Sequence, residues 1–361
     1  MRVLVADDSA LFRRIICKVL AGVPEVEVVG YAATGVAAVS KTKELRPDLV
    51  TLDIEMPGMN GLEVLDAFRE SGIQTNVILV SALSVRGSAL TLEGLSKGAF
   101  DFITKPSDGT YENNLNLIQA ELTPRVNVLA QRLAVRKILR PTVSLEPRSA
   151  SGKTASTSPV TFPSPAKRPE LVLIGVSTGG PNALERVLSR LPEDLGVPVV
   201  IVQHMPRLFT RLLAENLGRT SRLTVREASE RETLLPNVAY IAPGGRQMRL
   251  RPGANRAKVV DITDDPPENN CRPAVDYLFR SVAQNFPGAA LAVILTGMGN
   301  DGTLGLQLLK RHGCRVLVQD EPTCVVFGMP KAAIEAGVVD AVLPIDEIAS
   351  RITSAVRGVA P

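Results

Sequence analysis

The sequence predicts an α/β protein with an amino-terminal (βα)5 domain and a carboxyl-terminal, doubly wound, mostly parallel α/β domain. Three observations predict this class. Short runs rich in Val, Leu and Ile recur along the chain, at the length of strands buried in parallel sheets. Stretches of helical length separate these runs, as βαβ units require. The chain has 361 residues, which is too long for one ordinary hydrophobic core.

The first domain is expected over residues 1–122, where strand and helix alternate five times. Apolar runs that indicate strands cover residues 3–6, 49–52, 77–80 and 102–104. Helical stretches cover residues 10–20, 35–44, 61–71, 88–97 and 112–122. This alternation is typical of a compact (βα)5 unit.

Residues 123–169 are expected to connect the two domains. Pro124 should interrupt the last helix, because proline lacks the N–H that a helix interior uses. A basic amphipathic stretch over residues 125–140 then continues the helix and could pack between the domains. Residues 141–169 are rich in Pro, Ser and Thr and cannot offset the entropy of ordering by burial, so we expect a linker.

The second domain is expected over residues 170–359. Apolar strand runs return there at residues 171–174, 197–202, 290–295 and 315–318. Helical stretches lie between these runs, which predicts a second doubly wound sheet.

Composition excludes several classes of protein. The net charge is only +4 and the lysines and arginines are scattered, so a nucleic-acid groove is not expected. No apolar run reaches membrane-spanning length, and two carboxylates follow the first apolar run too soon for a signal peptide. We therefore expect a cytoplasmic monomer that does not insert into membranes. The four cysteines have no C-x-x-C spacing, which favours reduced structural thiols over a zinc site.

Chemically reactive residues follow the strands of the first domain: Asp7, Asp8, Asp53, Ser81 and Lys105. The carboxyl ends of parallel strands meet at one edge of a sheet, so these side chains should converge. Asp8 and Asp53 would hold Mg²⁺ and Asp7 would support it through water. Lys105 would neutralise a phosphate oxygen while Asp53 accepts the phosphoryl group as nucleophile.

Each of these residues also has a simpler interpretation. Asp7 and Asp8 could cap the following helix, and Asp53 could belong to the turn before Pro57. Lys105 could be a solvated lysine. The occurrence of all of them at successive strand ends favours a phosphoryl-transfer site.

At this point the first domain resembles two-component receiver domains. The resemblance covers the whole domain and rests on Asp7-Asp8-Ser9, Leu52-Asp53-Ile54-Glu55-Met56-Pro57, Val80-Ser81-Ala82 and Thr104-Lys105-Pro106. It implies that a histidine kinase phosphorylates Asp53, that the main-chain carbonyl of Glu55 helps to hold Mg²⁺, and that Ser81 turns toward the phosphate. Phe102 stands at the position of the switching aromatic residue, without the hydroxyl that such residues often carry.

The second domain begins with an apolar strand that runs into Gly175-Val176-Ser177-Thr178-Gly179-Gly180. Ser177 has the G-x-S-x-G spacing of a nucleophile held on a strained turn, and the following helix start offers N–H donors. A phosphate-binding loop would need a lysine after the glycines, and a dinucleotide turn would need G-x-G-x-x-G. A tight turn that merely needs small residues stays open.

Two further strand ends supply an imidazole and a carboxylate. His204 follows the run over residues 197–202, and Asp301 follows the run over residues 290–295. With Ser177 they form the set that acyl transfer needs: a nucleophile, a general base and a group that orients the base. A structural histidine and an ordinary Asp-Gly turn are the simpler alternatives. His312 is expected on the surface.

The second domain resembles the chemotaxis protein-glutamate methylesterases, the CheB family. The resemblance rests on the Ser177 motif together with Gln203-His204-Met205-Pro206, Arg272-Pro273-Ala274-Val275-Asp276 and Gly297-Met298-Gly299-Asn300-Asp301-Gly302. Ala274 stands where relatives commonly have serine. With the receiver, the resemblance covers nearly the whole chain except the linker.

The resemblance implies a serine hydrolase that removes methyl esters from glutamyl side chains of chemoreceptor helices and could also deamidate glutamines. It further implies an oxyanion hole formed by main-chain N–H groups at Met298 and near Thr178. No cofactor is expected in the catalytic domain. The unphosphorylated receiver would cover the catalytic residues, and phosphorylation of Asp53 would weaken that contact.

Two alternatives remain. A receiver can precede an effector domain that binds DNA or a partner without catalysis, although a helix-turn-helix unit with a basic helix is absent from this sequence. A general serine esterase that acts on small esters would use the same three residues.

Overall fold

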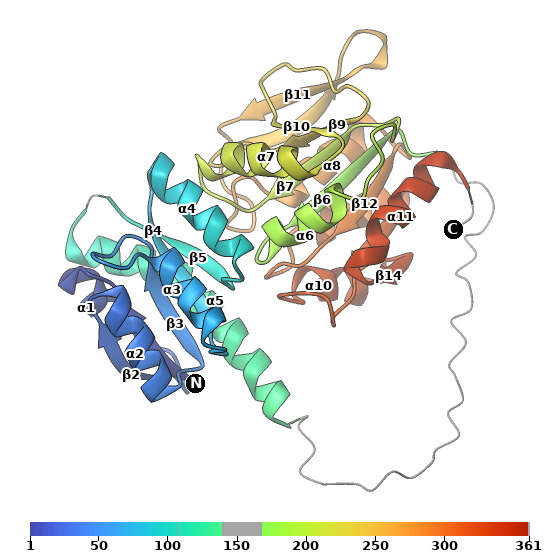
Figure 1. Cartoon of the computed structure of the whole chain (residues 1–361). Helices are drawn as coiled ribbons and strands as arrows, with labels where there is room; N and C mark the ends of the chain where they lie inside the picture. The colour runs from blue at the N-terminus through green and yellow to red at the C-terminus, as the bar shows by residue number, and fades with distance from the viewer. Residues whose placement is uncertain (108, 139–167, 360–361) are drawn as a thin grey trace, which may run out of the picture.

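The computed structural model describes residues 1–107, 109–138 and 168–359. The greater part of the expected linker lies outside these residues. Two parallel sheets, each covered by helices, form the centres of the two main parts of the described chain, and the first lies to the left of the second in Figure 1. No helix among the described residues is both long enough and apolar enough to span a bilayer.

The first sheet has five parallel strands in the order β2-β1-β3-β4-β5. The strands are β1 (Arg2–Ala6), β2 (Glu27–Ala32), β3 (Leu49–Asp53), β4 (Asn76–Ala82) and β5 (Asp101–Lys105). The helices are α1 (Ala10–Ala21), α2 (Gly35–Leu45), α3 (Gly61–Glu70), α4 (Val85–Ser96) and α5 (Tyr111–Ile138). The (βα)5 expectation is therefore confirmed.

Helix α5 runs through Pro124, so the predicted interruption there is wrong. A proline removes one helical hydrogen bond, but apolar residues that follow Pro124 pack into the hydrophobic core of the first domain. Val126 and Leu129 are fully buried in the receiver core, and the Arg125 Nε donates to Asp101 over 2.9 Å. These contacts offset the lost bond, so the helix continues past the predicted domain boundary at residue 122.

The second sheet has seven parallel strands in the order β14-β13-β12-β6-β7-β9-β8. The strands are β6 (Leu171–Val176), β7 (Val199–Gln203), β8 (Thr224–Glu227), β9 (Val238–Ile241), β12 (Ala290–Ile294), β13 (Arg315–Gln319) and β14 (Ala341–Leu343). An antiparallel pair, β10 (Gln247–Pro252) and β11 (Lys258–Thr263), lies beside it. The mostly parallel, doubly wound expectation is confirmed.

The helices of the second part are α6 (Gly180–Leu188), α7 (Phe209–Thr220), α8 (Val275–Asn285), α9 (Thr303–Arg311), α10 (Met329–Glu335) and α11 (Ile345–Arg357), with a short 3-10 turn, η1 (Ala254–Arg256). The first strand in sequence, β6, pairs with β12 on one side and β7 on the other. From β6, the next strands in the sequence are added on one side and the later strands on the other, so the order of strand addition reverses at β6. Ligands of such sheets collect at the carboxyl ends of the strands beside this point.

The two parts contact each other through the receiver helices and strand β5. Helix α4 packs against α6 and α7, as Figure 1 shows. The Phe102 ring stacks on Phe209 with centroids 4.6 Å apart. On α5, the Arg132 guanidinium donates to the carbonyl of Val325 over 2.9 Å, so the stretch after Pro124 does lie between the two parts.

Candidate active site

The receiver cluster lies at the carboxyl ends of β1, β3 and β5. Asp7 and Asp53 are buried, and Lys105 Nζ lies 2.8 Å from an oxygen of Asp7 and 2.7 Å from an oxygen of Asp53. Asp8 is exposed, and its carboxylate lies within 4.8 Å of the other two. Burial raises the pKa of Asp53 to about 6, although Lys105 opposes the shift.

Three clustered carboxylates are the oxygen ligands that Mg²⁺ prefers. Burial strengthens the repulsion between the ionised carboxylates of Asp7 and Asp53, and a divalent cation would offset it. The residues therefore fit the metal that a receiver domain requires for phosphorylation.

The structure does not bring the Ser81 hydroxyl to the carboxylates. Ser81 Oγ donates to the carbonyl of Gly87 over 3.2 Å and accepts from Thr91 Oγ1 over 2.7 Å, so it faces α4. Phe102 is also buried away from the cluster, against Phe209. Ser81 therefore contacts α4, which packs against α6 and α7, and Phe102 contacts α7 itself.

Ser177 directly follows β6 on a tight turn. Its N–H donates to the carbonyl of Thr296 over 3.0 Å, which joins the turn to the end of β12. A Cβ on Gly297 would lie 2.9 Å from the Ser177 Cβ, so only glycine permits this approach. Among the described residues, no hydrogen bond occupies the Ser177 hydroxyl.

His204 follows β7 and Asp301 follows β12, and the two side chains meet past the end of β6, the strand between them. His204 Nε2 lies 2.8 Å from Asp301 Oδ2, and His204 Nδ1 lies 3.5 Å from the sulfur of Cys271. Burial opposes charge on the imidazole, but hydrogen bonds to Asp301 and Cys271 outweigh it and raise the pKa of His204 to about 9. An ionised Asp301 accepts only, so Nε2 keeps its proton, and in the neutral imidazole Nδ1, which faces Cys271, is the nitrogen that can act as a base.

Asp301 is held by five donors. His204 Nε2 and the N–H of Val275 reach Oδ2, while Asn269 Nδ2 and the N–H groups of Asp276 and Gly302 reach Oδ1, all within 2.7 to 3.0 Å. Burial alone would raise the pKa of Asp301. The hydrogen bond and charge of His204, together with the backbone donors, lower it below its usual value.

The candidate oxyanion donors lie in the same pocket as Ser177. Thr178 and Met298 both line it, and no hydrogen bond within the described chain uses the N–H of either residue. The Thr178 side chain instead donates from Oγ1 to Asp101 of β5 over 2.7 Å. Two main-chain N–H groups without a partner among the described residues therefore belong to residues of the pocket that Ser177 lines.

The pocket around Ser177 and His204 has a volume of about 670 Å³. The receiver contributes to its walls, and the receiver residues that line it are Leu95, Asp101, Phe102, Ala120, Glu121, Pro124 and Arg125. In this arrangement the receiver closes one side of the pocket.

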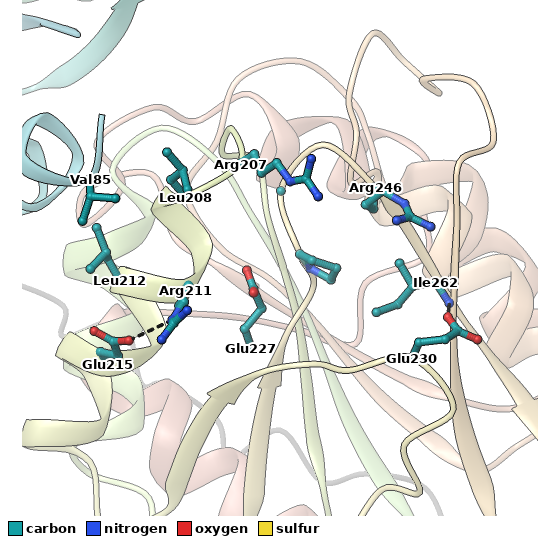
Figure 2. A pocket seen from close by; sticks show the side chains of 12 residues that line it. Val85, Arg207, Leu208, Arg211, Leu212, Glu215, Glu227, Glu230, Arg246 and Ile262 are labelled. Atoms are coloured by element: carbon teal, nitrogen blue, oxygen red, sulfur yellow. Dashed lines mark hydrogen bonds and ion pairs between the residues drawn. The ribbon is translucent and has the colours of Figure 1, made fainter. Parts of the chain in front are cut away.

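A second, slightly larger cavity of about 730 Å³ adjoins this pocket, and Arg207 lines both. Figure 2 shows it between α7 and the β10–β11 pair, with Arg211 paired to Glu215 and with Leu208 and Leu212 on one wall. It holds no nucleophile with a neighbouring base, so we place the chemistry in the pocket of Ser177 although the second cavity is larger.

Sequence reasoning missed Asn269 and Cys271, which contact Asp301 and His204. All four cysteines are free, as expected, but Cys271 lies at the site and not in a core. His312 is exposed, which confirms the expectation for it. Ala274 is buried at the start of α8, where it provides no side-chain cap.

Comparison with known proteins gives matches along the chain. The family model described as CheB methylesterase matches residues 172–352, and that of the response regulator receiver domain matches residues 3–111. A protein-glutamate methylesterase/protein-glutamine glutaminase of Desulfotalea psychrophila is 43% identical over 99% of both chains, and one of Bacillus subtilis is 42% identical over 99% of both.

Among solved structures, the catalytic domain of Thermotoga maritima CheB methylesterase matches with a TM-score of 0.50 and 43% identity. The match covers 52% of this chain and 98% of that one. Together with the order of the strands and the pocket of Ser177, these matches show that the chain belongs to the CheB family of protein-glutamate methylesterases/protein-glutamine glutaminases with an amino-terminal receiver domain.

Proposed function

We propose that this chain hydrolyses methyl esters on glutamyl side chains of chemoreceptors, under the control of phosphorylation at Asp53, and deamidates receptor glutamines through the same intermediate. The observation that carries the proposal is the ion pair between His204 and Asp301, 2.8 Å long, in the pocket that Ser177 lines. These are the parts of an acyl-transfer site.

Ser177 is the nucleophile in this proposal. Its oxygen attacks the ester carbonyl, and its proton passes to Nδ1 of His204, because Nε2 is already committed to Asp301. The N–H groups of Met298 and Thr178 would stabilise the oxyanion, each by about 3 kcal/mol. His204 then returns the proton to the leaving methoxide, and methanol departs.

Water completes the reaction. It attacks the acyl-enzyme while His204 Nδ1 takes its proton, and the proton then returns to Ser177 as the free glutamate leaves. A glutamine amide would release ammonia in the first half. Nothing in these steps needs a cofactor, so a chelator should leave the unstimulated rate unchanged.

The receiver acts as a gate in this proposal. A histidine kinase would phosphorylate Asp53, with Mg²⁺ held by Asp7, Asp8 and Asp53 and by the carbonyl of Glu55. Lys105, which now pairs with Asp53, would turn to the phosphate. Lys105 shares strand β5 with Asp101 and Phe102, so a shift of this strand would loosen the contacts to Thr178 and Phe209.

The test is methanol release from methylated receptor fragments and from small esters. Wild-type monomer should act on the receptor, faster with Mg²⁺ and a small phosphodonor, and Ser177→Ala should be inactive. Ser177→Ala with full turnover would refute the mechanism. Preference for small esters would favour a general esterase, and no hydrolysis of either would favour a non-catalytic effector.

Asp53→Asn tests the gate separately. It should keep the unstimulated rate and lose the response to the phosphodonor. An identical response in wild type and Asp53→Asn would refute control through Asp53.

A further inference from the structure

A β-turn that follows β11 contacts two of the three proposed catalytic residues. The turn spans residues 268–271, and its ends exchange two backbone hydrogen bonds between Glu268 and Cys271, of 3.1 and 2.8 Å. Its central residues, Asn269 and Asn270, have φ of 52° and 60°. Asparagine tolerates this left-handed conformation better than most residues, which makes the turn a stable feature.

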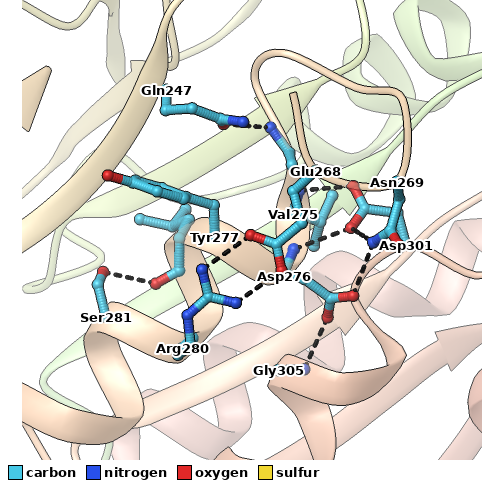
Figure 3. Close-up of polar contacts among 12 residues, drawn as sticks. Gln247, Glu268, Asn269, Val275, Asp276, Tyr277, Arg280, Ser281, Asp301 and Gly305 are labelled. Atoms are coloured by element: carbon cyan, nitrogen blue, oxygen red, sulfur yellow. Dashed lines mark hydrogen bonds and ion pairs between the residues drawn. The ribbon is translucent and has the colours of Figure 1, made fainter. Parts of the chain in front are cut away.

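Asn269 links two buried carboxylates. Its Nδ2 donates to Asp301 Oδ1 over 2.8 Å and to Asp276 Oδ2 over 2.9 Å, as Figure 3 shows. The other Asp276 oxygen accepts from the N–H of Gly305 at the start of α9. One amide group with two N–H donors thus lies between two acids that would otherwise repel each other.

The repulsion is substantial because both acids are buried. Asp276 is 1% exposed and Asp301 is 4% exposed. Burial, with the charge of Asp301 close by, raises the pKa of Asp276 to about 6. Without the donor between them, we expect Asp301 to shift within its remaining hydrogen bonds, so that its Oδ2 moves relative to His204.

The turn itself is fixed to the rest of the domain. Arg280 of α8 donates to both oxygens of Glu268, over 2.6 and 2.8 Å. Gln247 donates to the carbonyl of Cys271 over 3.2 Å. These hydrogen bonds fix the position of the turn and therefore of Asn269, as a residue that orients another side chain requires.

We propose that Asn269 is a positioning residue for the hydrolase reaction: its amide holds the Asp301 carboxylate in the orientation that aligns His204. This inference rests on the proposed function. We expect Asn269 to act through Asp301, so its loss should lower kcat far more than it changes KM. Misplacement of a catalytic group by about 1 Å can cost on the order of a hundredfold in rate.

Asn269→Gly and Asn270→Gly form a matched pair. Both keep a left-handed turn, because glycine adopts positive φ freely. Only Asn269→Gly removes the amide from the two acids, since no side-chain hydrogen bond of Asn270 exists among the described residues. We expect kcat for the receptor methyl ester to fall about ten- to a hundredfold in Asn269→Gly and to stay within about twofold in Asn270→Gly.

A spectroscopic readout separates positioning from activity. The chain has two histidines, so a protein labelled with ¹⁵N-histidine gives ring-nitrogen signals from only two imidazoles, and exposed His312 serves as an internal control. The His204 Nε2–H resonance should be strongly shifted by Asp301 in wild type and Asn270→Gly, and weakened or moved in Asn269→Gly.

Wild-type kcat and an unchanged His204 signal in Asn269→Gly would overturn the proposal. Equal losses in both glycine variants would also overturn it, because they would assign the effect to the turn backbone. If wild type failed to hydrolyse the receptor ester, the proposed function would fail, while the His204 signals would still test whether Asn269 positions Asp301.

Discussion

The receiver cluster and the hydrolase pocket both lie at the carboxyl ends of parallel strands, yet they stabilise their charges differently. In the receiver, one lysine pairs with two buried acids, and the pKa of Asp53 is raised to about 6. In the pocket, five donors surround Asp301 and its pKa is lowered. The buried acids of the first site are incompletely neutralised, as suits a site for a cation and a phosphoryl group, whereas the buried acid of the second site is already held by its donors.

The largest expected effect is on the unstimulated rate of demethylation, which should depend on Asp301 of the pocket and not on Asp53 of the receiver. Asp301→Asn should lower the unstimulated rate of receptor demethylation by about 10³-fold or more, because the His204 tautomer is no longer fixed. Asp53→Asn should leave that rate unchanged. Methanol release without phosphodonor measures both, and equal rates in the two variants would break the comparison.

The same two substitutions should have opposite effects on stability. The folded-state pKa of Asp53 lies above its ordinary value of 3.8, so ionisation of the carboxylate destabilises the fold increasingly from about pH 4 and fully above about pH 6. Asp53→Asn should therefore raise the free energy of unfolding of the receiver by about 2 kcal/mol at pH 7.5 without Mg²⁺, and the gain should vanish below about pH 4.

Asp301 has a lowered pKa, so its contribution to stability is present at neutral pH and is lost as pH falls. Asp301→Asn should reduce the free energy of unfolding by about 1–3 kcal/mol, because buried donors lose their acceptor. Urea unfolding at several pH values measures both variants. Changes of the same sign would contradict the account.

The unstimulated rate should depend on pH through His204. The base must be neutral, so with a pKa of about 9 the rate should rise about tenfold per unit from pH 7 and level off above pH 9. Contact with Cys271 is one cause of the raised pKa. Cys271→Ala should move the midpoint to lower pH, and Cys17→Ala, which removes a thiol of α1, is the control. Coincident midpoints for the two variants would rule out the thiol contact.

The smallest expected effect concerns the contact between the two regions. Stacking of Phe102 on Phe209 should contribute about 1 kcal/mol to closure. Phe102→Ala should raise the unstimulated rate about three- to tenfold and leave the phosphorylated rate unchanged. Leu117→Ala, an exposed position on α5, should change neither rate. A lower unstimulated rate in Phe102→Ala would show that the contact does not restrain the enzyme.

The sequence correctly predicted the buried strands that long apolar runs mark and the placement of reactive residues at the ends of those strands. Strands β6, β7, β12 and β13 coincide with such runs. Ser177 and His204, which follow β6 and β7, line one pocket, and Asp301, which follows β12, contacts His204 there. Strand β8 was missed because it is short and its side chains alternate between exposed and half-buried. Pro124 misled the prediction because packing of Val126 and Leu129, which a local rule ignores, keeps the helix intact.

The residues that contact the proposed catalytic side chains could not be predicted from the sequence, because their positions also depend on the packing of distant elements. Asn269 and Cys271 belong to a turn whose place depends on Glu268 and Arg280 meeting across a loop. The direction of Ser81 depends on Thr91, which lies on the next helix. Strand ends follow from periodicity, but contacts made by turns depend on how distant elements pack.

The most direct test of the account is covalent labelling of the intact chain with a serine-directed fluorophosphonate, followed by mass spectrometry. The account predicts one adduct, on Ser177, that forms slowly in the unphosphorylated protein and faster after a small phosphodonor and Mg²⁺ are added. An adduct on another serine, or the same rate of labelling in both states, would contradict it.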